Sequence, residues 1–301
     1  MNLSLAFVAR ALLCAACAGA ALAAHAQAQA SPRHFLWEVI SMSNRAYLFG
    51  TVHAGKKDWY PLPQAVEDAF ADSRVLVVEA DVTNVAAMEK TTPAMTYAPP
   101  DSLGKHVPPE DYERFRKQLA RHRIAEDQIA QLKPFMAVSV LVFSEWARLG
   151  YVAQFGVDSY LIRKARADLK SVVEIEGVDT QVRLMDSLTE ADHRQIFAGT
   201  LKALEAGITS EQITGMVNAW QSGDPGLMLE IAQRYNENVP GAKEFEEKFV
   251  WSRHEAMAQK IEGYMNDTRD RHFIAVGSLH LAGPRGLVEV LRKRGYIVRQ
   301  R

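Results

Sequence analysis

Cysteine is nearly absent from this chain, whose 301 residues contain two, Cys14 and Cys17. Both lie in residues 1–30, which have a basic residue near the start, an alanine-rich apolar stretch and several Ala-x-Ala sites. This pattern is typical of a secretory signal peptide. Its removal leaves a mature chain, residues 31–301, without cysteine. Disulfides, cysteine nucleophiles and thiolate metal sites are therefore excluded from the mature protein.

Two other uses of residues 1–30 stay open. The segment could be retained as a membrane anchor, or a lipid could be attached at Cys17, although "LLCAAC" lacks the usual leucine three residues before that cysteine. Cleavage after Ala26, Ala28 or Ala30 is equally compatible with the pattern. We expect a periplasmic or secreted protein.

Other absences narrow the class of protein. No stretch after the signal segment is long and apolar enough to span a bilayer. The net charge is -1 with both signs well mixed, so nothing indicates a surface for nucleic acid or anionic membranes. Neither Gly-x-Ser-x-Gly nor His-Glu-x-x-His occurs, which argues against a serine esterase and an ordinary zincin.

Short apolar runs predict a sheet. "FLWEVI" and "AYLFG", separated by a turn-like stretch, predict a hairpin. The continuous run Val75–Val78 predicts a central strand that is buried on both faces. "SVVEIEG" and "HFIAVG" predict two further strands, and "YIV" a last one.

Between these runs the pattern is helical, and "LPQAVEDAFADS" predicts a short helix early in the chain. "KPFMAVSVLVFSEWARLG" predicts a buried helix, and "GAKEFEEKFVWSRHEAMAQKIEGYM" one long amphipathic helical run. We predict an α/β fold in a single domain: a mixed, largely parallel central sheet flanked by helices, with a large helical insertion. The α/β core takes about residues 34–83, 171–178 and 272–301, and the helical region about 84–170 and 186–265.

The motif Gly-x-x-His occurs twice, at Gly50 to His53 and at Gly277 to His280. Each copy follows an apolar run and precedes a further glycine, Gly55 or Gly283, and glycine lets the backbone turn sharply. Two acids follow the other predicted strands, Glu79 after "VLVV" and Glu176 at the end of "SVVEIE". Since ligands of parallel sheets bind outside the carboxyl ends of the strands, we expect His53, Glu79, Glu176 and His280 to share one crevice.

Each of these residues also has a structural explanation. Either histidine alone is more often a hydrogen-bonded turn residue than a ligand, and Glu79 could be the first solvated residue after its strand. Glu174 competes with Glu176 because alternate residues of a strand share a face. Asp81 could cap the next helix, and Asp158 is best explained as a residue that starts a helix. The remaining histidines have polar or loop-like contexts that favour solvent exposure: His34, His106, His122, His193 and His272.

Arg253 and His254 lie on a predicted helix that could reach the crevice. There Arg253 could supply a positive charge for an oxyanion or a carboxylate. Two neutral imidazoles and one or two carboxylates make a site suited to Zn²⁺, Mn²⁺, Co²⁺ or Fe²⁺. The same groups could also act without metal, with a carboxylate-oriented histidine taking a proton from water.

These stretches together resemble the TraB/GumN family, which includes the Tiki proteases and is distantly similar to erythromycin esterases and haem-binding ChaN-like proteins. The resemblance runs from about Phe35 to Val298 and is carried by "FLWEV", "YLFGTVHAG", "LPQAVEDAF", "VLVVEAD", "GVDSYL", "EIEGVDTQ" and "FIAVGSLHLAGPRGLVEVLRKRGYIV". It implies a Tiki-like α/β fold and a metal-dependent hydrolase.

The resemblance also assigns residues. His53 and His280 match the two motif histidines, Glu79 matches the acid after the second core strand, and Glu176 with Gln181 matches an acid–glutamine signature. Many members have Arg-Asn where this chain has Arg253 followed by His254. That departure would change the site or add a ligand.

The leading hypothesis is a hydrolase of amide or ester bonds that acts outside the cytoplasm on a peptide, protein or small ester. His53 and His280 would hold a divalent ion (Mn, Co or Zn), with Glu79 as ligand or general base and Glu176 as an additional acid. One alternative is a binding protein for haem or free metal without turnover. Another is a metal-free esterase with His53 as base.

Overall fold

The computed structural model describes residues 33–267 and 269–301. The predicted signal peptide and both cysteines lie outside the described residues. Residues 34–301 form one compact unit. Among the described helices, none has the length and apolar character needed to cross a bilayer.

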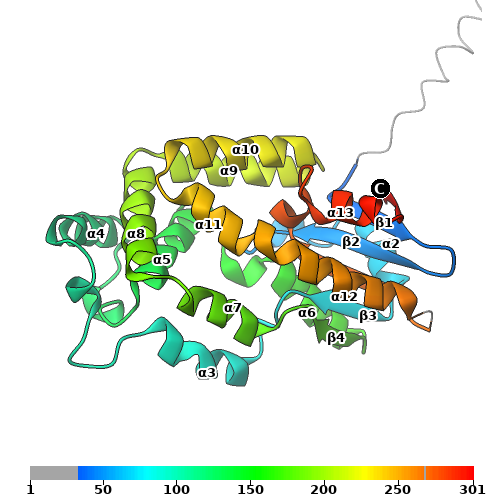
Figure 1. Ribbon diagram of the computed structural model, residues 1–301, viewed down its shortest axis with the longest axis horizontal. Helices are drawn as coiled ribbons and strands as arrows, with labels where there is room; N and C mark the ends of the chain where they lie inside the picture. The colour runs from blue at the N-terminus through cyan, green and yellow to red at the C-terminus, as the bar shows by residue number, and fades with distance from the viewer. Residues whose placement is uncertain (1–32, 268) are drawn as a thin grey trace, which may run out of the picture. The chain divides into compact units, whose positions relative to one another are not determined.

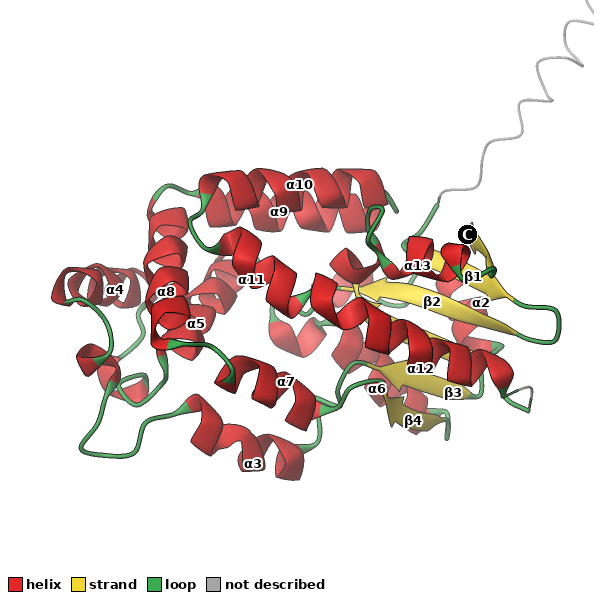
Figure 2. Cartoon of the chain, viewed as in Figure 1, coloured by secondary structure: helices red, strands yellow, loops and turns green. Residues whose placement is uncertain are grey.

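A mixed sheet of six strands forms the centre of this unit, with the order β4-β3-β5-β2-β1-β6 (Figures 1 and 2). β4, β3, β5 and β2 are mutually parallel, while β1 runs antiparallel to both β2 and β6. The strands are β1 Leu36–Ile40, β2 Arg45–Thr51, β3 Val75–Val78, β4 Ser171–Glu174, β5 His272–Gly277 and β6 Ile297–Gln300. The predicted α/β class, the hairpin and the largely parallel sheet are confirmed.

The insertion of β5 between β2 and β3 determines how the two Gly-x-x-His motifs meet. β5 comes from the end of the chain, yet it pairs in parallel with β2, so that Thr51 lies opposite Gly277. All four residues of β3 are buried, as the apolar run predicts for a strand covered on both faces. The two motifs therefore leave the sheet side by side.

Helices cover both faces of the sheet. α12 crosses the face toward the viewer of Figure 1, and α2 and α6 lie behind it. The core is continuous across these layers, with buried Phe70 of α2, Leu161 of α6 and Ile261 of α12 packed in one cluster with the strand residues. The helices that pack on the sheet are α2 Gln64–Ala71, α6 Val157–Ala167, α12 His254–Asn266 and α13 Leu287–Lys293, and of these α6 and nearly all of α12 fall within the predicted helical region.

The remaining helices, which all fall within the predicted helical region except α7, are α3 Val85–Met95, α4 Pro109–His122, α5 Pro134–Arg148, α7 Val178–Asp186, α8 Glu190–Glu205, α9 Ile208–Gln221, α10 Pro225–Asn238 and α11 Ala242–Phe249. α4, α5 and α8 enclose a second apolar core that includes Phe115, Leu141 and Phe197. Asp224 caps the start of α10, because its side chain accepts a hydrogen bond from the Leu227 N–H.

Two helix predictions need correction. α5 is not fully buried, since one side of it is open to solvent and Phe143 is 45% exposed. The predicted long helical run is broken after α11, because Val250 has φ -121° and ψ -70°, which is not helical. A short 3₁₀ turn, Trp251–Arg253, then leads into α12. Arg253 and His254 lie at this break.

Candidate active site

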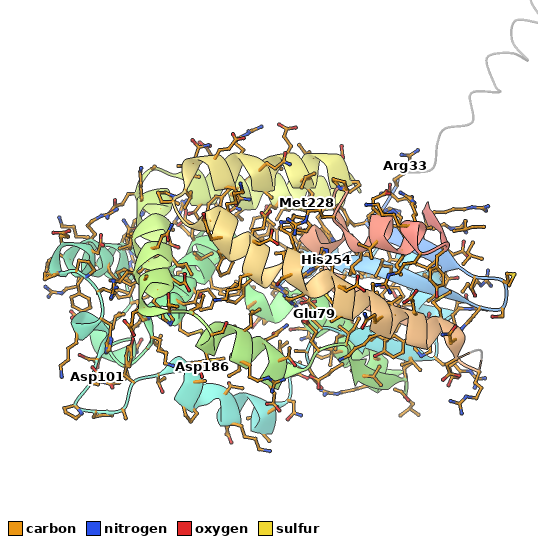
Figure 3. All side chains as sticks on the ribbon, in the orientation of Figure 1. Arg33, Glu79, Asp101, Asp186, Met228 and His254 are labelled. Atoms are coloured by element: carbon orange, nitrogen blue, oxygen red, sulfur yellow. The ribbon has the colours of Figure 1, made fainter. Side chains whose placement is uncertain are left out.

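Polar side chains follow the four parallel strands at one edge of the sheet. Glu79 comes directly after β3, and Glu176 comes two residues after the end of β4. His53 follows β2 by two residues, and His280 lies in a 3₁₀ turn, Ser278–Leu281, that follows β5. Figure 3 labels Glu79 and, on the neighbouring helix α12, His254. The expected meeting of strand ends is thus present in the backbone.

Glu79 is at the centre of the hydrogen bonds at this edge. Its Oε1 accepts a hydrogen bond of 2.6 Å from the Gly277 N–H, and its Oε2 accepts one of 2.6 Å from Nη2 of Arg253. Oε2 also lies 3.6 Å from Nε2 of His280. A Cβ on Gly277 would lie 3.3 Å from Oε1, which is tighter than ordinary van der Waals contact. Glycine there allows the carboxylate to approach the backbone closely.

Arg253 joins the two acids. Its Nε donates to Oε1 of Glu176 at 2.9 Å, and its Nη2 contacts both Glu79 and Glu176. Its Nη1 donates to the Phe249 carbonyl at 2.6 Å, which ties the guanidinium to the end of α11. The three charged side chains are between 9% and 14% exposed. A buried ion pair of this kind needs such complete hydrogen bonding to offset its desolvation.

The side chains of Glu174 and Glu176 have different partners, and only that of Glu176 contacts Arg253. Glu174 ends β4, and its carboxylate accepts a hydrogen bond of 2.5 Å from the Asp81 N–H. Glu176 contacts Arg253 and not the backbone. Asp81 does not cap α3, because Asn84 is the cap, and it instead accepts from Thr83 and binds Arg166.

His280 and His254 form a buried pair. Nε2 of His254 lies 2.8 Å from Nδ1 of His280, and Nδ1 of His254 lies 2.7 Å from the Arg285 carbonyl oxygen. The two residues are 5% and 3% exposed. Burial, and the positive charge of neighbouring groups, lower the pKa of His254 to about 4, so its ring is neutral at pH 7.

His53 has a different partner, Asp158. Oδ2 of Asp158 lies 2.9 Å from Nδ1 of His53, and Thr51 donates to Oδ1 at 2.6 Å, so the carboxylate is held from both sides. Asp158 is in the first turn of α6, where the helix dipole favours negative charge. Gly156 permits this approach, since a Cβ there would lie 2.3 Å from the His53 carbonyl oxygen.

The pKa shifts follow from these contacts. The Asp158 carboxylate raises the pKa of His53 to about 9, with a smaller contribution from Glu79, while the positive charge of Arg253 opposes the rise. Burial alone would raise the pKa of Glu79, but His280 and Arg253 outweigh it and hold that pKa well below its usual value. At neutral pH Glu79 is therefore ionised and His53 is protonated.

The donor chemistry fits a divalent ion in part. Zinc–nitrogen and zinc–oxygen bonds are about 2.0–2.2 Å long, so Nε2 of His280 and Oε2 of Glu79, 3.6 Å apart, can share one ion. Asp158 engages Nδ1 of His53 and leaves its Nε2 free, which is the usual support of a metal-binding histidine. Among the described residues, however, no three such side chains already converge as a metal cage. His53 is 66% exposed and belongs to a separate pair.

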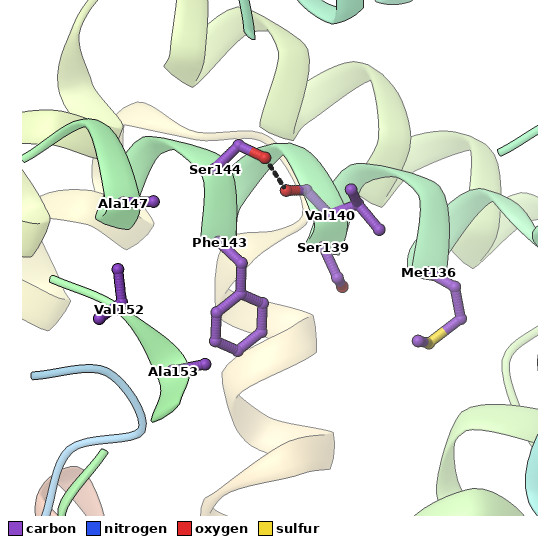
Figure 4. Close-up of a pocket in the computed structure, with 8 residues that line it drawn as sticks. All are labelled: Met136, Ser139, Val140, Phe143, Ser144, Ala147, Val152 and Ala153. Atoms are coloured by element: carbon purple, nitrogen blue, oxygen red, sulfur yellow. Dashed lines mark hydrogen bonds between the residues drawn. The ribbon is translucent and has the colours of Figure 1, made fainter. Parts of the chain in front are cut away.

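An apolar groove lies along α5 (Figure 4). It has a volume of about 400 Å³ and lies between the open side of α5 and the turn Ala153–Phe155. Phe143 points from α5 toward that turn in the figure. Val152, which lines the groove, forms a two-way backbone bridge with Gly55, two residues after His53. The groove is lined by Met136, Ser139, Val140, Phe143, Ser144, Ala147, Val152 and Ala153.

Several residues have tertiary contacts that their sequence context does not indicate. Asp158, predicted to start a helix, is also the partner of His53. The expected exposure of three histidines is wrong, because the His122 side chain is 4% exposed and His193 and His272 are buried. Polar neighbours in the sequence of these histidines do not indicate whether their side chains are buried by tertiary packing. Of the motif glycines, Gly283 has a positive φ, +73°, whereas Gly50, Gly55 and Gly277 serve close contacts instead of a left-handed turn.

Histidines, acids and an arginine thus gather at the carboxyl edge of the parallel strands of an α/β protein, which is where such sheets bind their ligands. The chain belongs to the TraB/PrgY/gumN family, whose sequence profile matches residues 35–300.

Individual relatives are distant. The chain is 23% identical over 269 residues to the uncharacterized protein YbaP of Escherichia coli (strain K12), covering 86% of this chain and 94% of that protein. It is 22% identical over 315 residues to Metalloprotease TIKI2 of Xenopus tropicalis, covering 88% and 59%. It is 20% identical over 316 residues to a Metalloprotease TIKI homolog of Nematostella vectensis, covering 88% and 66%. A comparison with solved structures found no match.

Proposed function

We propose that this protein is a metal-dependent hydrolase that cleaves an amide or ester bond outside the cytoplasm. The observation that carries the proposal is the meeting of Glu79, Glu176 and His280 at one sheet edge, with His53 following the adjacent strand. The family and the metalloprotease names of its relatives support hydrolysis. The signal-like residues 1–30 support the location.

His280, His53 and Glu79 are the residues that would hold the ion. A bound Mn²⁺, Co²⁺ or Zn²⁺ supplies a water of lowered pKa and polarises a carbonyl. Since a ligating histidine must be neutral, His53 has to release the proton that Asp158 favours, so ion binding strengthens as the pH rises toward about 9. Glu79 is ionised and acts as ligand or general base, while Arg253 orients both acids.

The apolar groove is where we place an apolar part of the substrate. Val152 lines the groove and is bridged to Gly55, two residues after His53. We therefore expect a substrate side chain that packs against Phe143 to place the neighbouring bond near His53. Pockets of this size with apolar walls hold single large side chains or short acyl chains. A peptide with a large apolar residue beside the cleaved bond fits this arrangement.

The test is metal content and turnover in the same samples. The protein is purified without chelators, its bound metals are measured, and a panel of peptides and esters is assayed with Mn²⁺, Co²⁺ or Zn²⁺. His53→Ala and His280→Ala should each lower metal content and turnover, whereas His34→Ala, before β1, should change neither. Full metal content in both site variants would refute the ligand assignment.

A second candidate is a metal-free hydrolase, favoured by the Asp158–His53 pair. A carboxylate that orients a histidine is the arrangement of a general base. Once the exposed His53 has lost its proton, near its pKa of about 9, its Nε2 could take a proton from water. Turnover that survives exhaustive chelation and is lost in His53→Gln would select this candidate. Turnover that chelation abolishes and Mn²⁺ or Zn²⁺ restores would reject it.

A further inference from the structure

Three phenylalanines from two helices stack on one another. The ring centroids of Phe245 and Phe249 on α11 lie 4.2 Å apart, and the ring of Phe135, at the start of α5, lies 5.6 Å and 5.5 Å from them. All three residues are half-buried, and none belongs to the hydrophobic cores found among the described residues. Packing of the core therefore does not account for these rings, which we call the phenylalanine stack.

The phenylalanine stack is joined to the charged part of the site. The Phe249 carbonyl accepts a hydrogen bond of 2.6 Å from Nη1 of Arg253, and the same guanidinium contacts Glu79 and Glu176. Phe245 lies one helical turn before Phe249, on the same face of α11. One end of the stack is thus the residue whose main chain holds Arg253.

The apolar groove adds another aromatic contact on the same helix. Phe143 is 45% exposed and points from α5 toward the turn Ala153–Phe155 (Figure 4). It comes eight residues after Phe135, which corresponds to about 80° around a helix and about 12 Å along its axis. Ser139, between the two, lines the groove. The stack and Phe143 therefore border one stretch of α5.

The length of this stretch suits an extended peptide. An extended chain rises about 3.3 Å per residue, and its alternate side chains point to the same side. Two side chains four positions apart therefore share a side and lie about 13 Å apart, close to the separation along α5. Side chains three or five positions apart point to opposite sides, so only one of them can face the helix.

We propose that the phenylalanine stack and Phe143 select an extended peptide with large apolar side chains four positions apart. One side chain packs on the stack, where ring centroids about 4.5–7 Å apart are favourable, and the other packs against Phe143. The stack is joined to Arg253, on the side of the two acids. The groove is joined through Val152 to Gly55, in the segment that follows His53. The proposal rests on the proposed function only in that the cleaved bond lies between the two side chains.

Peptide binding tests the spacing without depending on turnover. Short fluorescein-labelled glycine–serine peptides carry two Phe residues three, four or five positions apart, or a single Phe. Their Kd is measured by fluorescence anisotropy on the full chain, freed of metal with chelator. Because burial of a second Phe side chain tightens binding, the peptide with a spacing of four should have a Kd about 10-fold below the others. Equal Kd values for the three spacings, or no saturable binding, would overturn the proposal.

Two variants separate a peptide contact from a packing role. Phe245→Ala shortens the stack and leaves Phe249 and Arg253 in place, whereas Phe143→Ser removes an exposed ring. Each should erase the preference for a spacing of four, with folding checked by near-UV circular dichroism. Met42→Ala, in the hairpin between β1 and β2, should keep the preference, because Met42 is fully exposed and far from α5 in sequence. A preference that persists in folded Phe143→Ser would refute the paired contacts, whatever happens to Phe245→Ala.

Cleavage of the same peptides separates this proposal from the proposed function. With Mn²⁺, Co²⁺ or Zn²⁺ added, the peptide with a spacing of four should be cut between its two Phe residues, as located by mass spectrometry. Binding with the predicted spacing but without cleavage would reject the hydrolase and leave the paired contacts standing. Cleavage with the same kcat/KM for all three spacings would reject the paired contacts and leave the hydrolase standing.

Discussion

Arg253 is the cation that the two site acids share, and its removal should be costly. In Arg253→Met the side chains of Glu79 and Glu176, 11% and 9% exposed, lose their common partner. Removing one member of a buried ion pair costs about 3–5 kcal/mol. Glu79 keeps the Gly277 N–H and His280, so we expect the middle of that range, about 4 kcal/mol. At about 2.1 cal/mol/K of unfolding entropy per residue, roughly 270 folded residues give a corresponding fall in Tm of about 7 °C.

The assay is urea unfolding at pH 7.5, combined with a double-mutant cycle. Glu176→Gln in the Arg253→Met background removes one stranded charge and should recover about 1–3 kcal/mol. Arg253→Lys keeps the charge but not the planar fork that spans both carboxylates, so its recovery should be partial.

The pH dependence gives a further check of the same reasoning. The lowered pKa of Glu79 contributes stability that is present above its usual pKa of 4.5 and is lost as the pH falls through the folded-state pKa. The gap between the unmodified protein and Arg253→Met should therefore narrow below about pH 4.5. An unfolding free energy for Arg253→Met within about 0.5 kcal/mol of the unmodified value at pH 7.5 would refute the shared-cation reasoning.

Three other perturbations test separate parts of the site. Asp158→Asn should return the pKa of His53 from about 9 toward 6.5, measured by NMR titration. The contribution of the His53–Asp158 pair to the free energy of unfolding is complete below pH 6.5 and lost by about pH 9. Solvent screening of the exposed ring limits this contribution to about 1 kcal/mol. An unchanged His53 titration would contradict this. Gly156→Ala should cost about 1–3 kcal/mol in urea unfolding, because its Cβ would lie 2.3 Å from the His53 carbonyl oxygen, and a neutral result would disprove the close contact. Phe143→Ser should raise KM for peptides with a large apolar residue while stability changes little, since Phe143 is 45% exposed; equal KM values would remove the groove from substrate binding.

The strand ends of the site were predictable from sequence because their signals are local. An apolar run of four to six residues indicates a buried strand, and a parallel sheet brings the carboxyl ends of its strands to one edge. Glu79 and His280 are found by this argument, and the structure places them 3.6 Å apart. The order of the strands, with β5 between β2 and β3, was not needed for it.

The partners of these residues were harder to predict, because they depend on contacts between distant segments. Asp158 lies 105 positions after His53, and its helix-starting context gives a sufficient local explanation of the residue. The break at Val250 was also missed, since "KFVWSRHEAM" keeps an amphipathic pattern across it. The spacing of apolar residues does not predict that one residue, Val250, has non-helical backbone angles.

That break explains why the helical region is part of the site and not an optional insertion. Glu79 follows β3 and Glu176 lies two residues beyond β4, and these two buried carboxylates need a cation. Arg253 is the cation that contacts both. Arg253 and His254 lie at the start of α12, and consecutive helical residues point about 100° apart. Arg253 can therefore contact Glu79 and Glu176 while His254 contacts His280. Without Arg253 and His254 the sheet edge would hold unpaired buried charge, and His280 would lose the ring beside it, so the fold of the edge and its chemistry both depend on the residues at this break.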